Sequence, residues 1–448
     1  MTAPALIIPV ETKVREFDAK LLFSCVAAEA GHRVVFGSQR NIHLRIDSLP
    51  RGVYLTKDVR ASKLRVFDIL GDLGTAIVGW DEEGLVRYPS AHYFKMRVSP
   101  EALARVALWF AWGAEDAATM RTFPAFPGTP IHTVGNPRVD VLRRELRPYY
   151  DPEVNALRER FGRFVLINTN FGHSNHFLAK YTVRTEEFKE EMGEKDTSWD
   201  RDLAVHRDAM FRHFQAMIPA LARALPGTTI VVRPHPSEGD EVWRAAAAGA
   251  ANVQVVHEGS VLPWLLAADV LVHNGCTTAV EAFLLDRPAV TYKPIVSERF
   301  DRHLPDGLSV EAPDLDALVG EVESFVAGRD VAAVAAARRA LLDRHIAPQG
   351  ADLAAERVVR IVGEAGVEPT RGRAALAGQL KAKARAVQKL INTYVPGSKN
   401  WSVYEKRRFA ATGQAEVEDR IARFSALLGR FGAVRAHALA EDVFEITT

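Results

Sequence analysis

The chain has 448 residues, more than one hydrophobic core usually spans, so two or three domains are expected. Hydrophobic residues make up 48% and charged residues 25%, as in an average globular protein, and the net charge of +1 gives no argument for nucleic-acid binding. Cys25 and Cys276 suggest neither a disulfide framework nor a zinc site, and they fit a reducing compartment. Without an apolar run of about 18 residues or a signal peptide, we expect a cytoplasmic protein, with a peripheral position on the inner face of the membrane as the alternative.

Short apolar runs alternate with helical patterns in the first third of the chain. Ala5–Val10 predicts a buried strand, and Phe17–Ala30 predicts an amphipathic helix that Gly31 closes. Strands alternating with helices predict a parallel, doubly wound sheet. Gly135-Asn136-Pro137-Arg138 then interrupts the pattern. Further strands are expected at residues 33–36, 52–55, 75–80, 109–112 and 131–134.

A second α/β set follows a proline-containing linker at residues 148–152. Residues 313–363 and the tail from 371 onward predict helices, with a break at 394–398. We therefore expect an α/β protein of two facing Rossmann-like domains, at 1–147 and 148–365, with a helical basic tail at 366–448. The strands expected in the second domain are 164–168, 229–232, 253–257, 270–273 and 289–292.

Two polar loops about forty residues apart suggest a phosphate site. Arg233-Pro234-His235-Pro236 follows one predicted strand, and Asn274-Gly275-Cys276-Thr277-Thr278 follows another and leads into a helix. Ligands of open α/β sheets bind beyond the carboxyl ends of strands, and a helix N-terminus attracts anions. Arg233 suits phosphate, and His235 could donate a proton to a leaving phosphate, although Pro234 and Pro236 also suit a rigid turn.

The start of the second helix has two interpretations. Thr278 and Glu281 fit a capping box, in which both side chains satisfy helix-end N–H groups. Thr277 is then the freer hydroxyl for phosphate, and Glu281 either caps the helix or binds a ribose hydroxyl.

Further candidates follow other predicted strands. Asn168 and Asn170 begin a loop rich in amides and histidines, which suits a ligand. His173 and His176 lie in the same loop, but no carboxylate cluster accompanies them, so no metal is expected. The acidic run Asp81-Glu82-Glu83-Gly84 could supply a general base or form a solvated turn. Asp81 is also a candidate for the acceptor side. Four residues after the first strand are candidates for the acceptor side or for an ordinary charged helix start: Glu11, Lys13, Arg15 and Glu16.

The tail carries ten basic residues between positions 371 and 409, with Glu405 as the only acidic residue. Trp401 and Tyr404 lie nearby. Such a stretch either lies on an anionic membrane or forms a solvated helix face packed on the domains. The basic residues are Arg371, Arg373, Lys381, Lys383, Arg385, Lys389, Lys399, Lys406, Arg407 and Arg408.

With these motifs in order, the chain resembles the GT-B glycosyltransferases of bacterial surface polysaccharide synthesis, over residues 5 to 345. It is most similar to the surface carbohydrate biosynthesis group, which resembles capsule Kdo transferases and bacterial polysialyltransferases. Those relatives share an acidic-acidic-Gly motif, a His-Pro motif and a paired-hydroxyl motif, often Ser-Ser. The counterparts here are Glu82-Glu83-Gly84, His235-Pro236 and Thr277-Thr278.

The resemblance implies a glycosyltransferase that uses a CMP-activated acidic sugar such as Kdo, without a further cofactor. Its acceptor would be a surface polysaccharide or glycolipid. The second domain would hold the nucleotide, and the first would present the acceptor and the base. We favour Glu83 as the base, because it precedes Gly84 and matches the second acidic position of the motif.

Three other functions stay open. A sugar-nucleotide epimerase of the UDP-GlcNAc 2-epimerase type shares the two-domain form and a Gly-Asn hinge, but Asn274–Thr278 differs from the loop expected there. A polyol-phosphate transferase also carries a His-Pro loop. An inactive scaffold of a polysaccharide assembly complex would not need His235 or the acidic loop.

Overall fold

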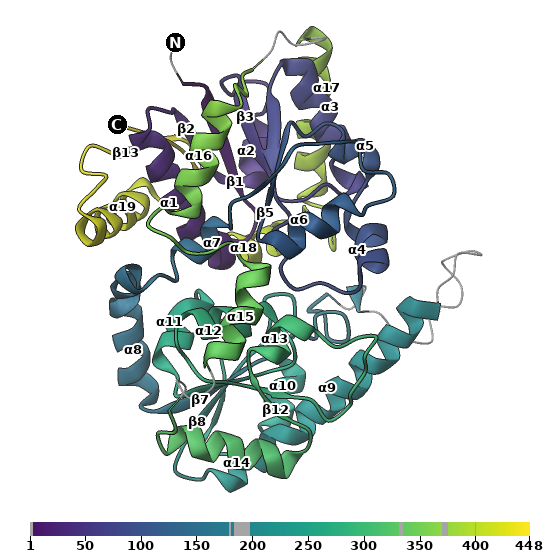
Figure 1. Ribbon diagram of the computed structural model, residues 1–448, viewed down its shortest axis with the longest axis vertical. Coiled ribbons are helices and arrows are strands. Elements are labelled where there is room, and N and C mark those ends of the chain that lie inside the picture. The colour runs from purple at the N-terminus through teal and green to yellow at the C-terminus, as the bar shows by residue number, and fades with distance from the viewer. Residues whose placement is uncertain (1–2, 179–180, 183–197, 331–334, 370–374, 399) are drawn as a thin grey trace. The chain divides into compact units, whose positions relative to one another are not determined.

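The computed structural model describes residues 3–178, 181–182, 198–330, 335–369, 375–398 and 400–448. The chain forms two compact units, each an α/β fold around a mainly parallel sheet (Figure 1). Unit 1 combines Met1–Tyr149 with Leu342–Thr448, and unit 2 is Tyr150–Leu341. The predicted α/β class with two Rossmann-like parts is confirmed.

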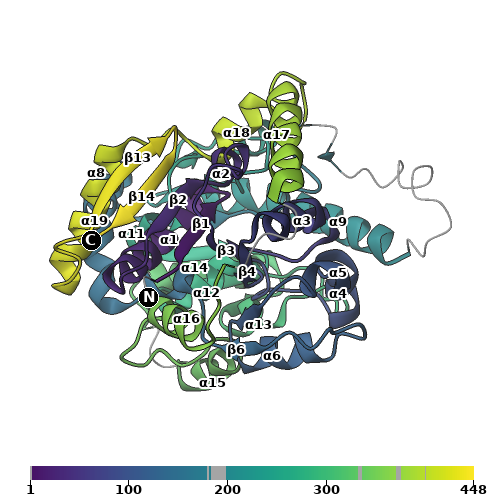
Figure 2. The same cartoon turned by 90° about the horizontal axis from the view of Figure 1, so that it is seen from above.

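Unit 1 contains an eight-stranded sheet in the order β13-β14-β2-β1-β3-β4-β5-β6. Its six N-terminal strands pair in parallel and lie close to the positions predicted from the sequence. Figure 2 shows β13 and β14 continuing this sheet beside β2. The parallel strands are β1 Ala5–Val10, β2 Val34–Ser38, β3 Gly52–Thr56, β4 Ala76–Gly79, β5 Leu108–Ala111 and β6 Ile131–Thr133.

The C-terminal part of the chain differs from the expected separate helical tail. Residues 342–448 belong to unit 1, so the second unit ends near 341 rather than 365. One physical reason is Asp140, whose carboxylate accepts the backbone N–H groups of Ala354 and Ala355 at 2.8 and 2.9 Å, at the start of α16. The last residues are also not helical. They form a hairpin, β13 Arg435–Ala440 and β14 Val443–Thr447, whose second strand pairs antiparallel with β2.

Gly37 permits this strand addition. A Cβ atom at Gly37 would lie 2.0 Å from the backbone oxygen of Asp442, so only glycine allows the hairpin turn to approach β2.

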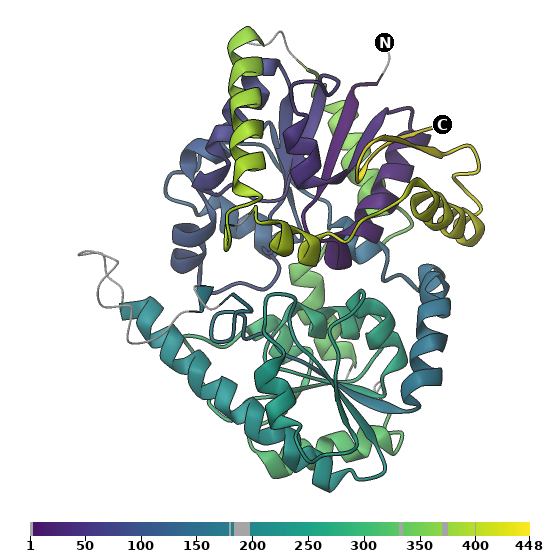
Figure 3. The same cartoon turned by 180° about the vertical axis from the view of Figure 1, so that it is seen from behind.

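Four helices precede the hairpin in unit 1, and α17 stands along the outside of the unit (Figure 3). They are α16 Ala354–Glu364, α17 Ala375–Asn392, α18 Ser402–Arg408 and α19 Gln414–Leu428.

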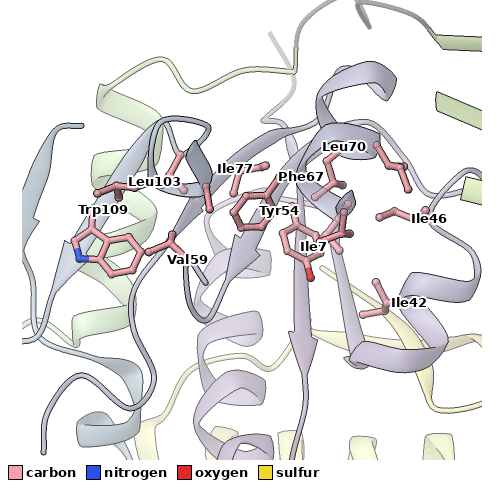
Figure 4. Packing of buried hydrophobic residues seen from close by; sticks show 14 of the residues in the cluster. Ile7, Ile42, Ile46, Tyr54, Val59, Phe67, Leu70, Ile77, Leu103 and Trp109 are labelled. Carbon is pink, nitrogen blue, oxygen red and sulfur yellow. The ribbon is translucent and has the colours of Figure 1, made fainter. Parts of the chain in front are cut away.

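One core of unit 1 lies between the sheet and α3 (Leu64–Leu73). β-branched and aromatic side chains of the strands fill it, as expected for strands that are buried on both faces (Figure 4). Tyr54, Phe67 and Trp109 are each at most 2% exposed. The sheet is therefore a rigid base for the loops that leave its carboxyl edge.

Unit 2 contains a six-stranded parallel sheet in the order β12-β11-β10-β7-β8-β9. Five strands match the predicted positions closely, while β12 Val310–Ala312 was not predicted. This strand is only three residues long and half-exposed at the sheet edge, so its sequence has little hydrophobic pattern. The other strands are β7 Phe164–Asn168, β8 Thr229–Arg233, β9 Val253–Val255, β10 Val270–His273 and β11 Ala289–Tyr292.

Helices cover both sheets, and short 3₁₀ turns span Ala61–Lys63 and Arg144–Tyr150. In unit 1, the remaining helices are α1 Lys13–Glu29, α2 Gln39–Leu44, α4 Ser90–Arg97, α5 Pro100–Leu103, α6 Ala114–Arg121 and α7 Pro137–Asp140. Unit 2 contains α8 Asp151–Phe161, α9 Ser198–Ala224, α10 Glu241–Ala246, α11 Val261–Ala267, α12 Thr277–Leu284, α13 His303–Gly307 and α14 Leu315–Val326. Helix α15, Ala335–His345, crosses the division between the units.

Candidate functional site

The predicted polar loops of unit 2 leave adjacent strands. β7 lies between β10 and β8 in the sheet, so the loops that follow these three strands begin side by side at the carboxyl edge. Asn168, the last residue of β7, pairs with Arg233, the last residue of β8. Neighbouring residues in register point to the same face of a sheet, so these two side chains share one face.

Asn168 is the clearest sign of a ligand in unit 2. The residue is 4% exposed, and neither atom of its side-chain amide has a hydrogen-bond partner among the described residues. Burying an unpaired amide costs free energy, on the order of 1–3 kcal/mol by mutational data. A polar group that a ligand supplies would remove this cost.

Arg233 adds a buried positive charge beside Asn168. Its guanidinium donates to the backbone oxygens of Glu258 and Gly259, while its Nε has no partner among the described residues. Burial lowers the pKa of Arg233 to about 10, although the carboxylates of Glu281 and Glu258 raise it, so the side chain stays charged at neutral pH. The carboxylate of Glu281 in α12 is therefore close enough to Arg233 for the two charges to interact.

The start of α12 corrects the capping-box interpretation. The helix begins at Thr277 with Cys276 as its N-cap, so Thr278 is inside the first turn. The side chain of Cys276 makes no capping hydrogen bond, and the first turn contains no acidic residue. The first turn of α12 therefore supplies neither a side-chain cap nor an acidic residue to the positive end of the helix dipole. Gly275 allows the chain to turn into α12, because its φ of 75° is a conformation that glycine adopts readily and other residues do not.

His273 fixes the turn that leads into α12. Its Nε2 lies 2.7 Å from the hydroxyl of Ser309, and its Nδ1 accepts the backbone N–H of Gly275 at 2.9 Å. Burial lowers the pKa of His273 to about 3, so the ring is neutral and structural at neutral pH. Asn274 follows it, and its side-chain oxygen has no partner among the described residues.

His235 is held in one tautomer. The backbone N–H of Ser237 donates to its Nδ1 at 3.2 Å, and the Ser237 hydroxyl lies 2.8 Å from the same atom. Because Nδ1 is an acceptor, the neutral ring carries its proton on Nε2. The loop after β7 lies close by, since a Cβ atom on Gly172 would meet the Ser237 hydroxyl at 2.2 Å.

Glu238 was missed by the sequence analysis, and it organises this region. Its fully buried carboxylate accepts hydrogen bonds from the Thr169 hydroxyl, the Phe171 N–H, the His235 N–H and the Trp243 indole, at 2.8 to 3.1 Å. Two loops are thus tied to one side chain. The signal in the sequence is a carboxylate three residues after His235, the spacing at which a Glu side chain reaches back to a backbone N–H.

The remaining predicted residues of unit 2 are less enclosed. Asn170 and His173 are exposed, while Pro236, Thr277, Thr278 and Glu281 are half-buried. Asn168, Arg233 and the start of α12 thus lie at the same edge of the sheet, whereas the side chain of Asn170 is exposed to solvent. Within the described residues, no group of three or more His, Cys, Asp or Glu side chains is placed to hold a metal ion.

In unit 1, the acidic loop leaves the carboxyl end of β4, and its three carboxylates differ. Asp81 forms an ion pair with Arg97 and accepts the hydroxyl of Tyr93 at 3.0 Å and the backbone N–H of Glu83 at 3.0 Å. Its backbone oxygen also accepts the Trp112 indole at 2.8 Å. Asp81 therefore shapes the loop, and its buried, saturated carboxylate does not suit the predicted acceptor-side role.

Glu82 is 2% exposed. One carboxylate oxygen accepts the Trp80 indole at 2.7 Å and lies 3.9 Å from Lys20. The other has no hydrogen-bond partner among the described residues and lies 3.9 Å from Arg138. The carboxylate of Glu82 therefore interacts with the cations Lys20 and Arg138.

Glu83 is the open carboxylate of the loop, with 36% of its side chain exposed. Arg15 contacts both of its oxygens, at 2.8 and 3.2 Å. Although burial raises the pKa of Glu83, the charges of Arg15, Lys57 and Arg138 outweigh this effect and lower the pKa to about 2. Glu83 is thus ionised over the whole physiological range.

The other predicted acceptor-side residues are paired. Glu11 forms ion pairs with Lys57 and Arg408, and Lys57 also contacts Glu16 at 3.1 Å. Lys20 donates to Glu16 at 2.7 Å, at a position where both side chains are at most 4% exposed. Lys13 instead pairs with Glu416 of α19 at 3.0 Å, away from this network.

Sequence analysis missed two cations of the network, Lys20 and Lys57. Lys57 follows β3 directly, and this strand-end position was the available signal. Lys20 lies one helical turn after Glu16 in α1, a spacing that also occurs on ordinary solvated helices. Only the burial of Glu16 and Lys20 in the structure distinguishes this pair from an ion pair on a solvated helix.

No helix in the described part of the chain is both long and apolar enough to cross a membrane. A comparison with profiles of known protein families gives no match, and no curated protein sequence matches the chain.

Solved structures show a similar fold at low sequence identity. A variant of the wall teichoic acid polymerase TagF soaked with CDPG superposes with a TM-score of 0.50 at 10% identity, over 81% of this chain and 88% of that one. The UDP-GlcNAc 2-epimerase of Methanocaldococcus jannaschii gives 0.48 at 13% identity, over 80% and 99% of the two chains. Anabaena Alr3699/HepE in complex with UDP-glucose gives 0.45 at 10% identity, over 81% and 100%. The chain thus has a GT-B-like fold.

Proposed function

We propose that the protein is a transferase that uses a nucleotide-activated donor, and that unit 2 binds the donor phosphate. The observation that carries this proposal is the buried amide of Asn168, which has no partner among the described residues, beside the buried charge of Arg233. A phosphate there would accept from Arg233 Nε and from the first N–H groups of α12. Thr277 supplies a half-buried hydroxyl at the same helix start.

We further propose a CMP-activated acidic sugar as the donor, and a surface polysaccharide or glycolipid as the acceptor. The support is the family resemblance of the three motifs, carried here by Glu82-Glu83-Gly84, His235-Pro236 and Thr277-Thr278. In this reaction, the Nε2–H of His235 donates a hydrogen bond to the leaving phosphate. Glu83 takes the proton of the acceptor hydroxyl, because it is the one accessible carboxylate of its loop.

The first experiment separates a ligand-binding amide from a structural one. Asn168→Leu removes a polar group that has no partner among the described residues, so unfolding in urea should show equal or greater stability. The same variant should lose most of its affinity for CMP in calorimetric titration. The matched control is Asn252→Leu, because the Asn252 amide donates to three backbone oxygens, so that variant should lose stability. An Asn168→Leu protein that is destabilised but binds CMP normally would contradict the phosphate site.

The second experiment identifies the nucleotide. CMP at about 100 times its dissociation constant should stabilise the fold by about 2.7 kcal/mol in thermal unfolding, without added metal. Stabilisation by UDP but not by CMP would exclude the CMP-sugar and favour the epimerase, which would also convert UDP-GlcNAc without an acceptor. Nucleotide binding without turnover of any donor would favour the scaffold.

A polyol-phosphate transferase is the second candidate. The observation that favours it is the likeness to the wall teichoic acid polymerase TagF soaked with CDPG, which extends over 81% of this chain. CMP release from CDP-glycerol, but not from a CMP-sugar, would establish this alternative and leave the phosphate site in place.

A further inference from the structure

Helix α17 is attached to unit 1 through one face. Gly378 and Ala382 lie on this face, and a Cβ atom on Gly378 would meet the Cβ of Asp72 at 3.0 Å, so the helix lies directly against α3. Lys381 adds an ion pair with Asp72 at 2.7 Å, and Arg65 of α3 donates to Gln388 at 2.6 Å. Figure 3 shows α17 standing on the outside of the unit.

The opposite face of α17 is apolar and open to solvent. Exposed side chains recur at three- and four-residue intervals, from 49% exposed at Leu390 to 85% at Tyr394, just after the helix. This spacing places them in one stripe along the helix. A helix that is apolar on the side away from its own domain marks an interaction surface. The stripe consists of Leu376, Leu380, Val387, Leu390, Ile391 and Tyr394.

Positive charge dominates this part of the chain. Between residues 375 and 409, Glu405 is the only acidic residue, and Lys383 and Lys406 are exposed. Arg385 of α17 and Arg40 of α2 each have a buried guanidinium nitrogen without a partner among the described residues. Burial, together with Arg385, Arg40 and Lys63, lowers the pKa of Lys389 to about 7, because Lys389 lies on the inner face of the helix, seven residues after Ala382. Arg371, Arg373 and Lys399 of the predicted basic stretch lie outside the described residues.

We propose that α17 docks unit 1 on an anionic lipid bilayer, with its apolar stripe in the interface and its exposed lysines toward the headgroups. The charge decides the occupant, since an apolar stripe on a helix that carries four cations and no acidic residue complements anionic lipid. Tyr394 extends the stripe, and tyrosine is enriched at the headgroup level. α17 is not apolar enough to cross a membrane, so it lies in the plane of the surface.

The test is flotation of the full chain with vesicles of phosphatidylcholine alone and with added phosphatidylglycerol. The triple variant Leu380→Ser, Val387→Ser and Ile391→Ser should bind the anionic vesicles at least about 100-fold more weakly, because three large apolar side chains no longer enter the interface. All three positions are exposed, so the fold should be unchanged. The matched control, Met96→Ser with Leu439→Ser, alters exposed apolar side chains elsewhere on unit 1 and should bind normally.

A second measurement locates the contact. Both native cysteines are buried, so Val387→Cys can be labelled selectively with an environment-sensitive dye. Its emission should shift to the blue with anionic vesicles, and a label at Leu439→Cys should not respond. The proposal is overturned if the wild type ignores anionic vesicles, or if the triple variant floats as well as the wild type. A dimer in solution that the triple variant abolishes, without vesicle binding, would instead assign the stripe to a second copy.

Discussion

The carboxylate of Glu238 accepts the backbone N–H of His235 at 3.1 Å, and the same oxygen accepts the Phe171 N–H at 2.9 Å. One buried side chain thus joins the loops that follow β8 and β7. The relationship gives Glu238 a positioning role, because it holds the backbone of the residue proposed to donate a hydrogen bond to the leaving phosphate.

Glu238→Ala should lower the stability of unit 2 by at least about 3 kcal/mol, since four buried donors lose their acceptor. Urea unfolding measures this loss. Glu241→Ala, an exposed carboxylate three residues later, is the matched control and should change stability little. A Glu238→Ala protein as stable as the wild type would show that water replaces the carboxylate without cost.

His235→Ala should lower kcat by about 10²–10³-fold, the usual effect of removing one hydrogen-bond donor to developing negative charge, and weaken nucleotide binding. The two amide variants sharpen the test. His235→Asn keeps an acceptor near Nδ1 for the Ser237 N–H and should be as slow as alanine. His235→Gln places an amide N–H near the Nε2 position and should retain part of the rate. Equal activity of all three variants and the wild type would exclude His235 from the reaction.

Glu82→Gln and Glu83→Gln should differ. Glu83→Gln should lose kcat with donor binding nearly intact, since the proposed base touches the acceptor rather than the nucleotide. Glu82→Gln should retain most of its turnover but lose stability, because Glu82 faces Lys20 and Arg138 in a buried network. Near wild-type turnover of Glu83→Gln would remove Glu83 as the base and leave Glu11 as the next candidate.

The ion pair of Arg15 and Glu83 predicts how kcat/KM should depend on pH. The pKa of Glu83 is lowered to about 2, so this carboxylate stays ionised and kcat/KM should show no Glu83-dependent loss between pH 7 and about 5. Arg15→Met removes one of the cations that lower this pKa, while burial still raises it. The acidic limb should therefore move to higher pH. An unchanged acidic limb in Arg15→Met would contradict Glu83 as the titrating base.

His273 should make the fold sensitive to acid. Its pKa is about 3 in the folded chain and about 6.5 when unfolded, so between these values the unfolded state binds more protons. Stability therefore falls as the pH drops below about 6.5, by up to about 2 kcal/mol at pH 5 from this group. His273→Asn keeps an acceptor for the Gly275 N–H and should show a smaller loss between pH 7 and 5 in urea unfolding. An equal loss in both proteins would assign the acid sensitivity to other groups.

The local sequence by itself determined the two parallel sheets and the strand ends that carry the polar loops. Runs such as Ala5–Val10 and Phe164–Asn168 are apolar throughout, because strands covered on both faces need no polar alternation. In a parallel sheet, all strands end at the same edge. Predicting the strands from their apolar runs therefore also predicts that Asn168, Arg233 and the start of α12 lie at the carboxyl edge of one sheet.

Only the tertiary structure decided which of these side chains have partners. The sequence does not show that Asp81 is saturated by Arg97 and Tyr93, or that Glu238 collects four donors. It also places residues 366–448 in a separate tail, whereas the hairpin of β13 and β14 extends the sheet of unit 1. These features depend on contacts between residues up to four hundred positions apart, such as Gly37 with Val443, and no local pattern records them. Burial, pairing and strand addition are properties of the assembled fold, whereas periodicity and strand-end chemistry are properties of the chain.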